Sequence, residues 1–115
     1  MAKTIHRSGQ ALKDYLLLMA SLQGLSVDEQ ADLLGKMRAG DSASMRELVE
    51  AYLPKVLLWV APRRGEGFSF QELIAIGNSA LIEGLQQYKG EAARLEEKAC
   101  QFVHDALDTA LKLQS

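Results

Sequence analysis

Apolar side chains recur every three or four positions along most of this chain, and no segment alternates strictly between apolar and polar residues. The first spacing is typical of helices with one buried face, whereas alternation would indicate a strand. The pattern predicts five helices, at about residues 10–23, 26–40, 41–60, 69–88 and 91–113. We therefore expect an all-α, five-helix bundle.

Three helix starts carry local signals. Ser26 with Glu29, and Ser69 with Glu72, have the spacing of a capping box, in which each side chain binds the other residue's backbone N–H. Asp41 is a preferred N-cap for the third helix. Pro54 lies inside that helix and should kink it or split it in two, because proline has no backbone N–H to donate.

The fourth helix has the clearest division into faces. Its apolar side contains Phe70, Leu73, Ile74, Gly77, Leu81, Leu85 and Tyr88. At about 100° per residue, Ala75, Ser79 and Glu83 point the other way, with Ile76 beside them. Ile76 would either tuck under the first or fifth helix or form a small exposed apolar spot. The small residues Gly77, Ala80 and Gly84 predict close packing inside the bundle, or a dimer seam.

Composition narrows the class of protein. The chain has 115 residues, 48% hydrophobic and 24% charged, which fits one globular domain. No signal peptide or membrane-spanning run is visible, and Cys100 is the single cysteine, so we expect a cytoplasmic protein. The net charge of −2 argues mildly against DNA as the principal partner.

Catalytic chemistry finds little support in the residue pattern. His6 and His104 are the two histidines, and neither has a metal-ligand spacing with another His, Cys or carboxylate. Cys100 and His104 lie four apart on one predicted helix, but a buried structural cysteine is the simpler interpretation. The loop 62–67 lacks the features of a phosphate-binding glycine loop. We expect no catalytic residue, metal or cofactor.

The order of residues in the fourth helix resembles the helix of bacterial sigma factor domain 2 that docks on the coiled coil of the RNA polymerase β′ subunit. The resemblance is carried by Glu72-Leu73-Ile74, Gly77-Asn78 and Leu81-Ile82-Glu83. Segments within 25–29, 38–41, 47–54 and 63–70 extend it over about residues 25–88. It implies one sigma domain 2-like domain at 1–115, with an N-terminal helix in 1–24 and a divergent last helix at 91–113.

The chain departs from this family in two places. The stretch Lys98 to Leu107 lacks the tyrosine and paired tryptophans with which sigma factors capture unpaired promoter bases. No later sigma domain follows within these residues, so promoter melting is not expected. Ala75 and Ile76 replace the Gln and Glu usual in the family, and Ser79 stands where Leu is common.

The resemblance implies a module that contacts RNA polymerase core at β′, or an anti-sigma-like protein, with weak or absent DNA binding and no membrane. The candidate partner-binding residues are Glu72, Ala75, Ile76, Asn78, Ser79 and Glu83. Arg63 and Arg64 would contact nucleic acid or an acidic partner, or else complement the dipole at a helix C-terminus. The alternative function is a helical homodimeric scaffold, with Ile76 and the first helix at its seam.

Overall fold

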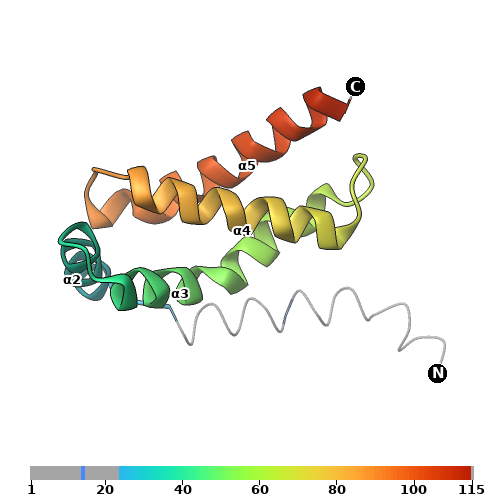
Figure 1. Ribbon diagram of the computed structural model, residues 1–115. Helices are drawn as coiled ribbons and strands as arrows, with labels where there is room; N and C mark the ends of the chain where they lie inside the picture. The colour runs from blue at the N-terminus through green and yellow to red at the C-terminus, as the bar shows by residue number, and fades with distance from the viewer. Residues whose placement is uncertain (1–13, 15–23, 115) are drawn as a thin grey trace.

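The computed structural model describes Asp14 and residues 24–114, and these residues contain no strand. Within them lie four α-helices: α2 (Val27–Arg38), α3 (Ser42–Val60), α4 (Phe70–Gln87) and α5 (Leu95–Gln114) (Figure 1). Short 3₁₀ turns, η1 (Ala61–Arg63) and η2 (Ala92–Arg94), precede α4 and α5. The all-α class is confirmed, with four helices in this part of the chain rather than five. The helix expected at 10–23 falls, Asp14 apart, outside the described residues.

The three helix starts predicted from capping signals are confirmed in detail. In α2, Ser26 Oγ accepts from Glu29 N at 3.1 Å, and Glu29 Oε1 accepts from Ser26 N at 2.9 Å. Ser69 and Glu72 form the same reciprocal pair in front of α4, at 3.1 and 2.8 Å. Asp41 caps α3 by accepting from Ala43 N. These starts depend on residues at most three apart, so local sequence is enough to place them.

Pro54 does not split α3, which continues as one helix from Ser42 to Val60. The split alternative is therefore wrong. The ribbon of α3 bends along its length in Figure 1. A bend is the response expected where proline leaves the carbonyl one turn earlier without its helical donor.

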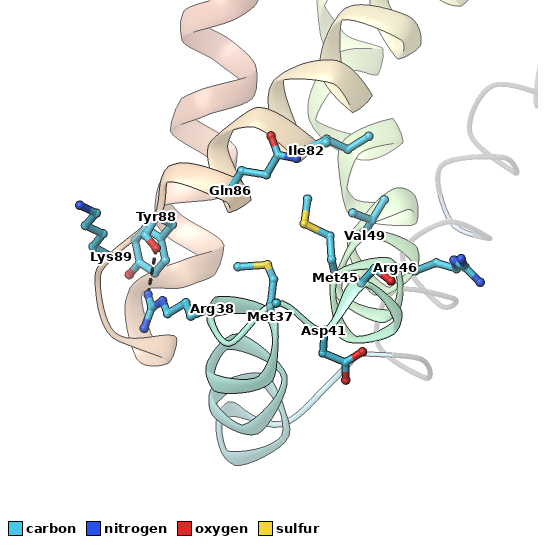
Figure 2. A pocket seen from close by; sticks show the side chains of 12 residues that line it. Met37, Arg38, Asp41, Met45, Arg46, Val49, Ile82, Gln86, Tyr88 and Lys89 are labelled. Carbon is cyan, nitrogen blue, oxygen red and sulfur yellow. Dashed lines mark hydrogen bonds between the residues drawn. The ribbon is translucent and has the colours of Figure 1, made fainter.

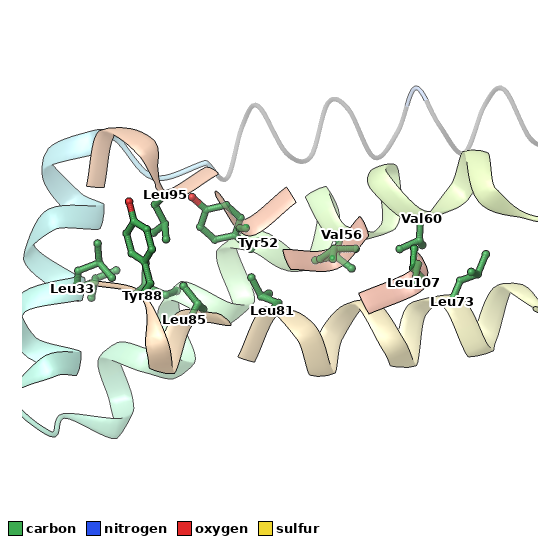
Figure 3. Packing of buried hydrophobic residues seen from close by; sticks show 14 residues of the cluster. Leu33, Tyr52, Val56, Val60, Leu73, Leu81, Leu85, Tyr88, Leu95 and Leu107 are labelled. Atoms are coloured by element: carbon green, nitrogen blue, oxygen red, sulfur yellow. The ribbon is translucent and has the colours of Figure 1, made fainter. Parts of the chain in front are cut away.

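The apolar core lies where α3, α4 and α5 pack against one another, and α2 lies across the beginning of α3 (Figures 1 and 3). The largest fully buried side chains are Tyr52, Leu34, Leu48, Leu73, Leu81, Leu85, Leu95, Leu107, Val56, Val60 and Val103. Leu73, Leu81 and Leu85, which were predicted on the apolar side of α4, are among them. The core is continuous from α2 to the far end of α4.

The buried stripe of α5 ends before the helix does. Leu95, Ala99, Val103 and Leu107 follow one another at intervals of four and are fully buried. Leu113, at the end of the predicted fifth helix, is 84% exposed. A row with spacing four continues from Leu107 to residue 111, and residue 113 then lies about 200° away on the helix.

A buried polar contact joins α2 to α3. Tyr52 Oη donates to Gln30 Oε1 at 2.7 Å, and Gln30 Nε2 donates to Leu25 O at 2.9 Å. Burial raises the pKa of Tyr52 well above its ordinary value, so the phenol stays neutral and can donate. Leaving Gln30 without this partner inside the protein would be unfavourable, so the contact fixes how α2 lies on α3.

The small residues of α4 serve internal packing. A Cβ on Gly77 would lie 2.8 Å from Val56 Cγ1 and 3.1 Å from Val60 Cγ1, both in α3. A Cβ on Gly84 would lie 2.1 Å from Phe102 Cδ2 in α5. Real carbon atoms do not approach so closely, so these two glycines set the distance of α4 from both neighbours.

We predict that Gly84→Ala lowers the free energy of unfolding by about 1–2 kcal/mol, measured by urea denaturation. Helix propensity alone would favour alanine by about 1 kcal/mol, but the added methyl collides with the Phe102 ring. The matched control is Gly35→Ala in α2, where a Cβ would meet nothing within 4 Å. This control should be stabilising. Equal stabilisation by both substitutions would contradict the packing of Gly84 against Phe102.

Candidate partner-binding surface

Five of the six predicted contact residues lie on one stripe of α4. Glu72, Ala75, Ile76, Ser79 and Glu83 follow the spacing i, i+3, i+4, i+7 and i+11, which places them along one side of a helix. Four of them line a shallow hollow of about 360 Å³ together with Ala80 and with Ala106 of α5; Glu72 lies on the stripe beyond the hollow. We call this the α4–α5 hollow.

Small side chains give the hollow its depth. Ala75 and Ser79 are exposed, while Ala80 is buried and Ala106 half-buried. Ile76 is half-buried and packs against the core cluster. Both interpretations of Ile76 therefore apply in part, because it packs inward and still lines the surface. Whether it also touches the first helix lies outside the described residues.

Two carboxylates stand beside the hollow. Glu83 and Asp105 both line an adjoining depression of about 220 Å³, which continues along the α4–α5 seam. Both residues are exposed, and within residues 24–114 neither has an ion pair. The seam thus combines small apolar side chains with negative charge, a chemistry that favours a partner with basic side chains.

Asn78 is not brought together with the other candidates. It lies about 200° from Ile76 around the helix axis, on the flank of α4 that also carries Ile82. Its side chain is half-buried. A partner that covers the α4–α5 hollow would not contact Asn78 by the same surface, so the predicted set divides into a stripe and one outlying residue.

Glu72 caps α4, in addition to being a candidate contact for a partner protein. Hydrogen bonds from the backbone and the hydroxyl of Ser69 lower the pKa of this carboxyl. The side chain is exposed, and one oxygen is engaged by Ser69 N. A partner would therefore meet a carboxylate that is ionised and held in place at the start of α4.

Arg63 is engaged within the protein. Its Nη2 lies 2.6 Å from Asp108 Oδ1 and 2.9 Å from Glu66 Oε1, and its Nη1 donates to His104 O at 3.3 Å. These bonds, first of all the one to Glu66, raise the pKa of Arg63. The side chain is 15% exposed. A phosphate that contacted Arg63 would have to compete with these bonds. The sequence alone did not indicate that Arg63 contacts α5.

Arg64 matches the helix-end interpretation. Its Nε donates to Ala61 O at 3.2 Å, at the end of α3, and its guanidinium lies 5.7 Å from the ring centroid of Phe70. Arg64 is exposed, so it remains accessible while it helps to close the turn before α4. The two adjacent arginines therefore have different surroundings.

Cys100 does not have the environment of an activated thiol. It is half-buried on α5, and burial, with a smaller contribution from Glu96, raises the pKa of its thiol. A raised pKa keeps the sulfur protonated, and a protonated thiol is a poor nucleophile. In the part of the chain that the structure describes, no group of three His, Cys, Asp or Glu side chains could hold a metal ion.

Comparison with known proteins assigns no family. No family model matches this chain, and no curated protein matches it. The described helices include none long and apolar enough to span a membrane. The resemblance to sigma domain 2 therefore depends on the sequence segments quoted above.

We predict that the Glu72→Gln substitution changes stability in a pH-dependent way. The lowered pKa means that ionised Glu72 stabilises the fold above its ordinary pKa of 4.5, and that this contribution is lost as pH falls through the lower folded value. The difference in unfolding free energy between wild type and Glu72→Gln should be largest near neutral pH and should shrink in acid. Urea denaturation from about pH 7 down to about pH 3 measures it. A difference that stays constant would contradict the capping role of the charge.

Proposed function

We propose that this chain is a sigma domain 2-like module without enzymatic activity. Its partner would be the β′ coiled coil of RNA polymerase, or else a regulatory protein that recognises sigma factors. The single observation that carries the proposal is the exposed stripe of α4 beside the α4–α5 hollow. Five candidate residues, expected from the resemblance together with helical periodicity, lie along this stripe. The module would occupy a sigma-binding surface and so modulate initiation.

The shape of the surface supports a protein partner. A helical partner needs a seam into which its side chains can fit, and the small residues Ala75, Ser79 and Ala106 leave such space. Glu83 and Asp105 would pair with basic side chains at the rim of the contact. Rim charges of this kind affect association rate and partner choice more than total affinity.

The exposed face of α5 supports a role without DNA melting. Base capture needs exposed aromatic rings and cations along the strand. The aromatic side chain of α5 is Phe102, which is half-buried against Gly84. The exposed charged positions of α5 are mostly carboxylates: Glu96, Glu97, Asp105 and Asp108, with Lys112. Such a face would repel the phosphates of a single strand.

We predict that the purified protein binds core RNA polymerase of its bacterial host and that the main sigma factor of that host displaces it. The double substitution Ser79→Arg with Glu83→Lys should weaken binding at least about tenfold, because it fills the hollow and reverses the charge beside it. The control is Glu50→Lys, which repeats the Glu83→Lys charge reversal at an exposed site on α3. Competition binding measures both, and circular dichroism checks that helix content is unchanged.

Several results would contradict this proposal. Equal loss of binding in the Glu50→Lys control would mean that net charge, not the α4 stripe, determines affinity. No binding of the wild type at about 10 µM would remove polymerase as the partner. A molecular mass that rises with concentration would then favour the homodimeric scaffold. Salt-sensitive binding to a single-stranded promoter element would instead favour a promoter-binding fragment.

A further inference from the structure

A second and larger concave surface lies on the other flank of α4. It is an open groove of about 780 Å³ between the end of α2, the first half of α3 and the last turns of α4 (Figure 2). This volume falls within the range of functional binding sites, about 300–1,000 Å³. The floor is apolar and consists of Met37, Met45, Val49 and Ile82. We call it the methionine groove.

The floor is formed by side chains that the fold leaves partly uncovered. Met37, Met45 and Val49 pack against the core cluster but are only half-buried. Ile82 is 39% exposed and is one of the few large hydrophobic side chains on the described surface. Figure 2 shows the two methionine side chains projecting into the space between α2, α3 and α4. Methionine is flexible and polarisable, so such a floor can adapt to an apolar partner.

Cations flank this floor. Arg46 of α3 and Lys89, which follows α4, lie on opposite sides of the groove in Figure 2. Both are exposed, and within residues 24–114 neither has an ion pair. Some other cations of this part of the chain, such as Lys55 and Arg63, are paired with carboxylates. The described residues thus place two cations without an ion pair on opposite sides of one apolar floor.

Arg38 adds a third positive charge and shapes one end of the groove. Its Nη2 donates to Tyr88 O at 3.0 Å and to Gly90 O at 2.8 Å, and its guanidinium lies over the Tyr88 ring. These partners are neutral, so the charge of Arg38 is not cancelled by them. The contact also holds the segment after α4, which carries Lys89, against the end of α2.

The carboxylate that lines the groove is already engaged. Asp41 accepts from Ala43 N at 3.1 Å and from Ser44 Oγ at 2.8 Å, and the latter bond, with the former, lowers the pKa of this carboxyl. Its charge therefore stabilises the start of α3 and offsets only part of the positive charge around the groove. The remaining charge complements anions.

The chemistry of the groove favours a peptide helix over other anions. A nucleic acid strand would need an exposed ring for stacking, but Tyr88 is the aromatic residue in the lining and is 8% exposed. A fatty acid would need an enclosed tunnel to cover its chain, whereas this groove is open. A helix with an apolar stripe flanked by carboxylates would cover the floor and reach Arg46 and Lys89 together.

We propose that the methionine groove binds an acidic amphipathic helix of a partner protein. This inference is independent of the polymerase proposal. Ile82 and Glu83 are neighbours in sequence but lie on different flanks of α4, so the groove and the α4–α5 hollow can be occupied at the same time. The module would then join two partners, one on each flank of the same helix.

The test uses the full chain and two synthetic helical peptides of about 18 residues, a length sufficient to hold helical structure. Both carry leucines at i, i+3, i+4 and i+7; one is flanked by glutamates and the other by lysines. Methyl NMR follows Met37 and Met45, and fluorescence anisotropy measures affinity up to about 100 µM, the range of weak interfaces. The acidic peptide should bind and shift both methyl signals, and its affinity should fall as the salt concentration rises. The basic peptide should not bind.

Charge reversal provides the decisive variant. Arg46→Glu with Lys89→Glu alters two exposed side chains outside the core, so the fold should persist. This double substitution should lower the affinity for the acidic peptide at least about tenfold and permit binding of the basic peptide. The matched control, Arg94→Glu with Lys112→Glu, makes the same change in net charge at exposed residues outside the groove lining and should leave both affinities unchanged.

Three outcomes would overturn the proposal. Equal binding of the two peptides would mean that the rim charges are not recognised. Absence of binding to either peptide would exclude a helix of this chemistry. Equal effects of the groove variant and its control would show that only net charge matters. None of these outcomes bears on polymerase binding, which is measured separately.

Discussion

The close approach of α4 to α3 and α5 is the constraint on which the rest of this structure depends. Gly77 lies against Val56 and Val60 on one side, and Gly84 lies against the ring of Phe102 on the other. Because no side chain separates these backbones, Leu73, Leu81 and Leu85 reach fully buried positions between the helices. A larger residue at either glycine would displace α4 and disturb the contacts that make up the core.

The same constraint determines which side chains α4 leaves outside. With its inner face closed by small and apolar residues, the helix presents two flanks. One flank meets α5 and forms a hollow of small side chains beside Glu83 and Asp105. The other faces α2 and α3 across a floor that includes Met45 and Ile82. The two surfaces have opposite charge, so one helix can present distinct chemistry to two partners.

Polar ties fix the elements around α4. The buried contact between Tyr52 and Gln30 sets α2 on α3, and Arg38 then holds the segment after α4 at the end of α2. At the far end, Arg63 connects η1 to α5 through Asp108 and the carbonyl of His104. The bond between Tyr52 and Gln30 is buried, and a buried polar group that lost its partner would remain unsatisfied, so this bond favours one position of α2 over others of similar apolar burial.

Local sequence by itself determined the helix class and the helix starts, because the caps at Ser26, Asp41 and Ser69 use residues no more than three positions away. It also determined the buried face of α4, since helical periodicity alone separates the faces. Only the tertiary structure decided the hydrogen-bond partners of Arg63 and Arg38. Asp108 is 45 residues from Arg63, and Tyr88 is 50 residues from Arg38. The methionine groove likewise needs three helices at once. Periodicity within one helix carries no information about which neighbour covers each flank, and that is the physical reason why the groove had no sequence signal.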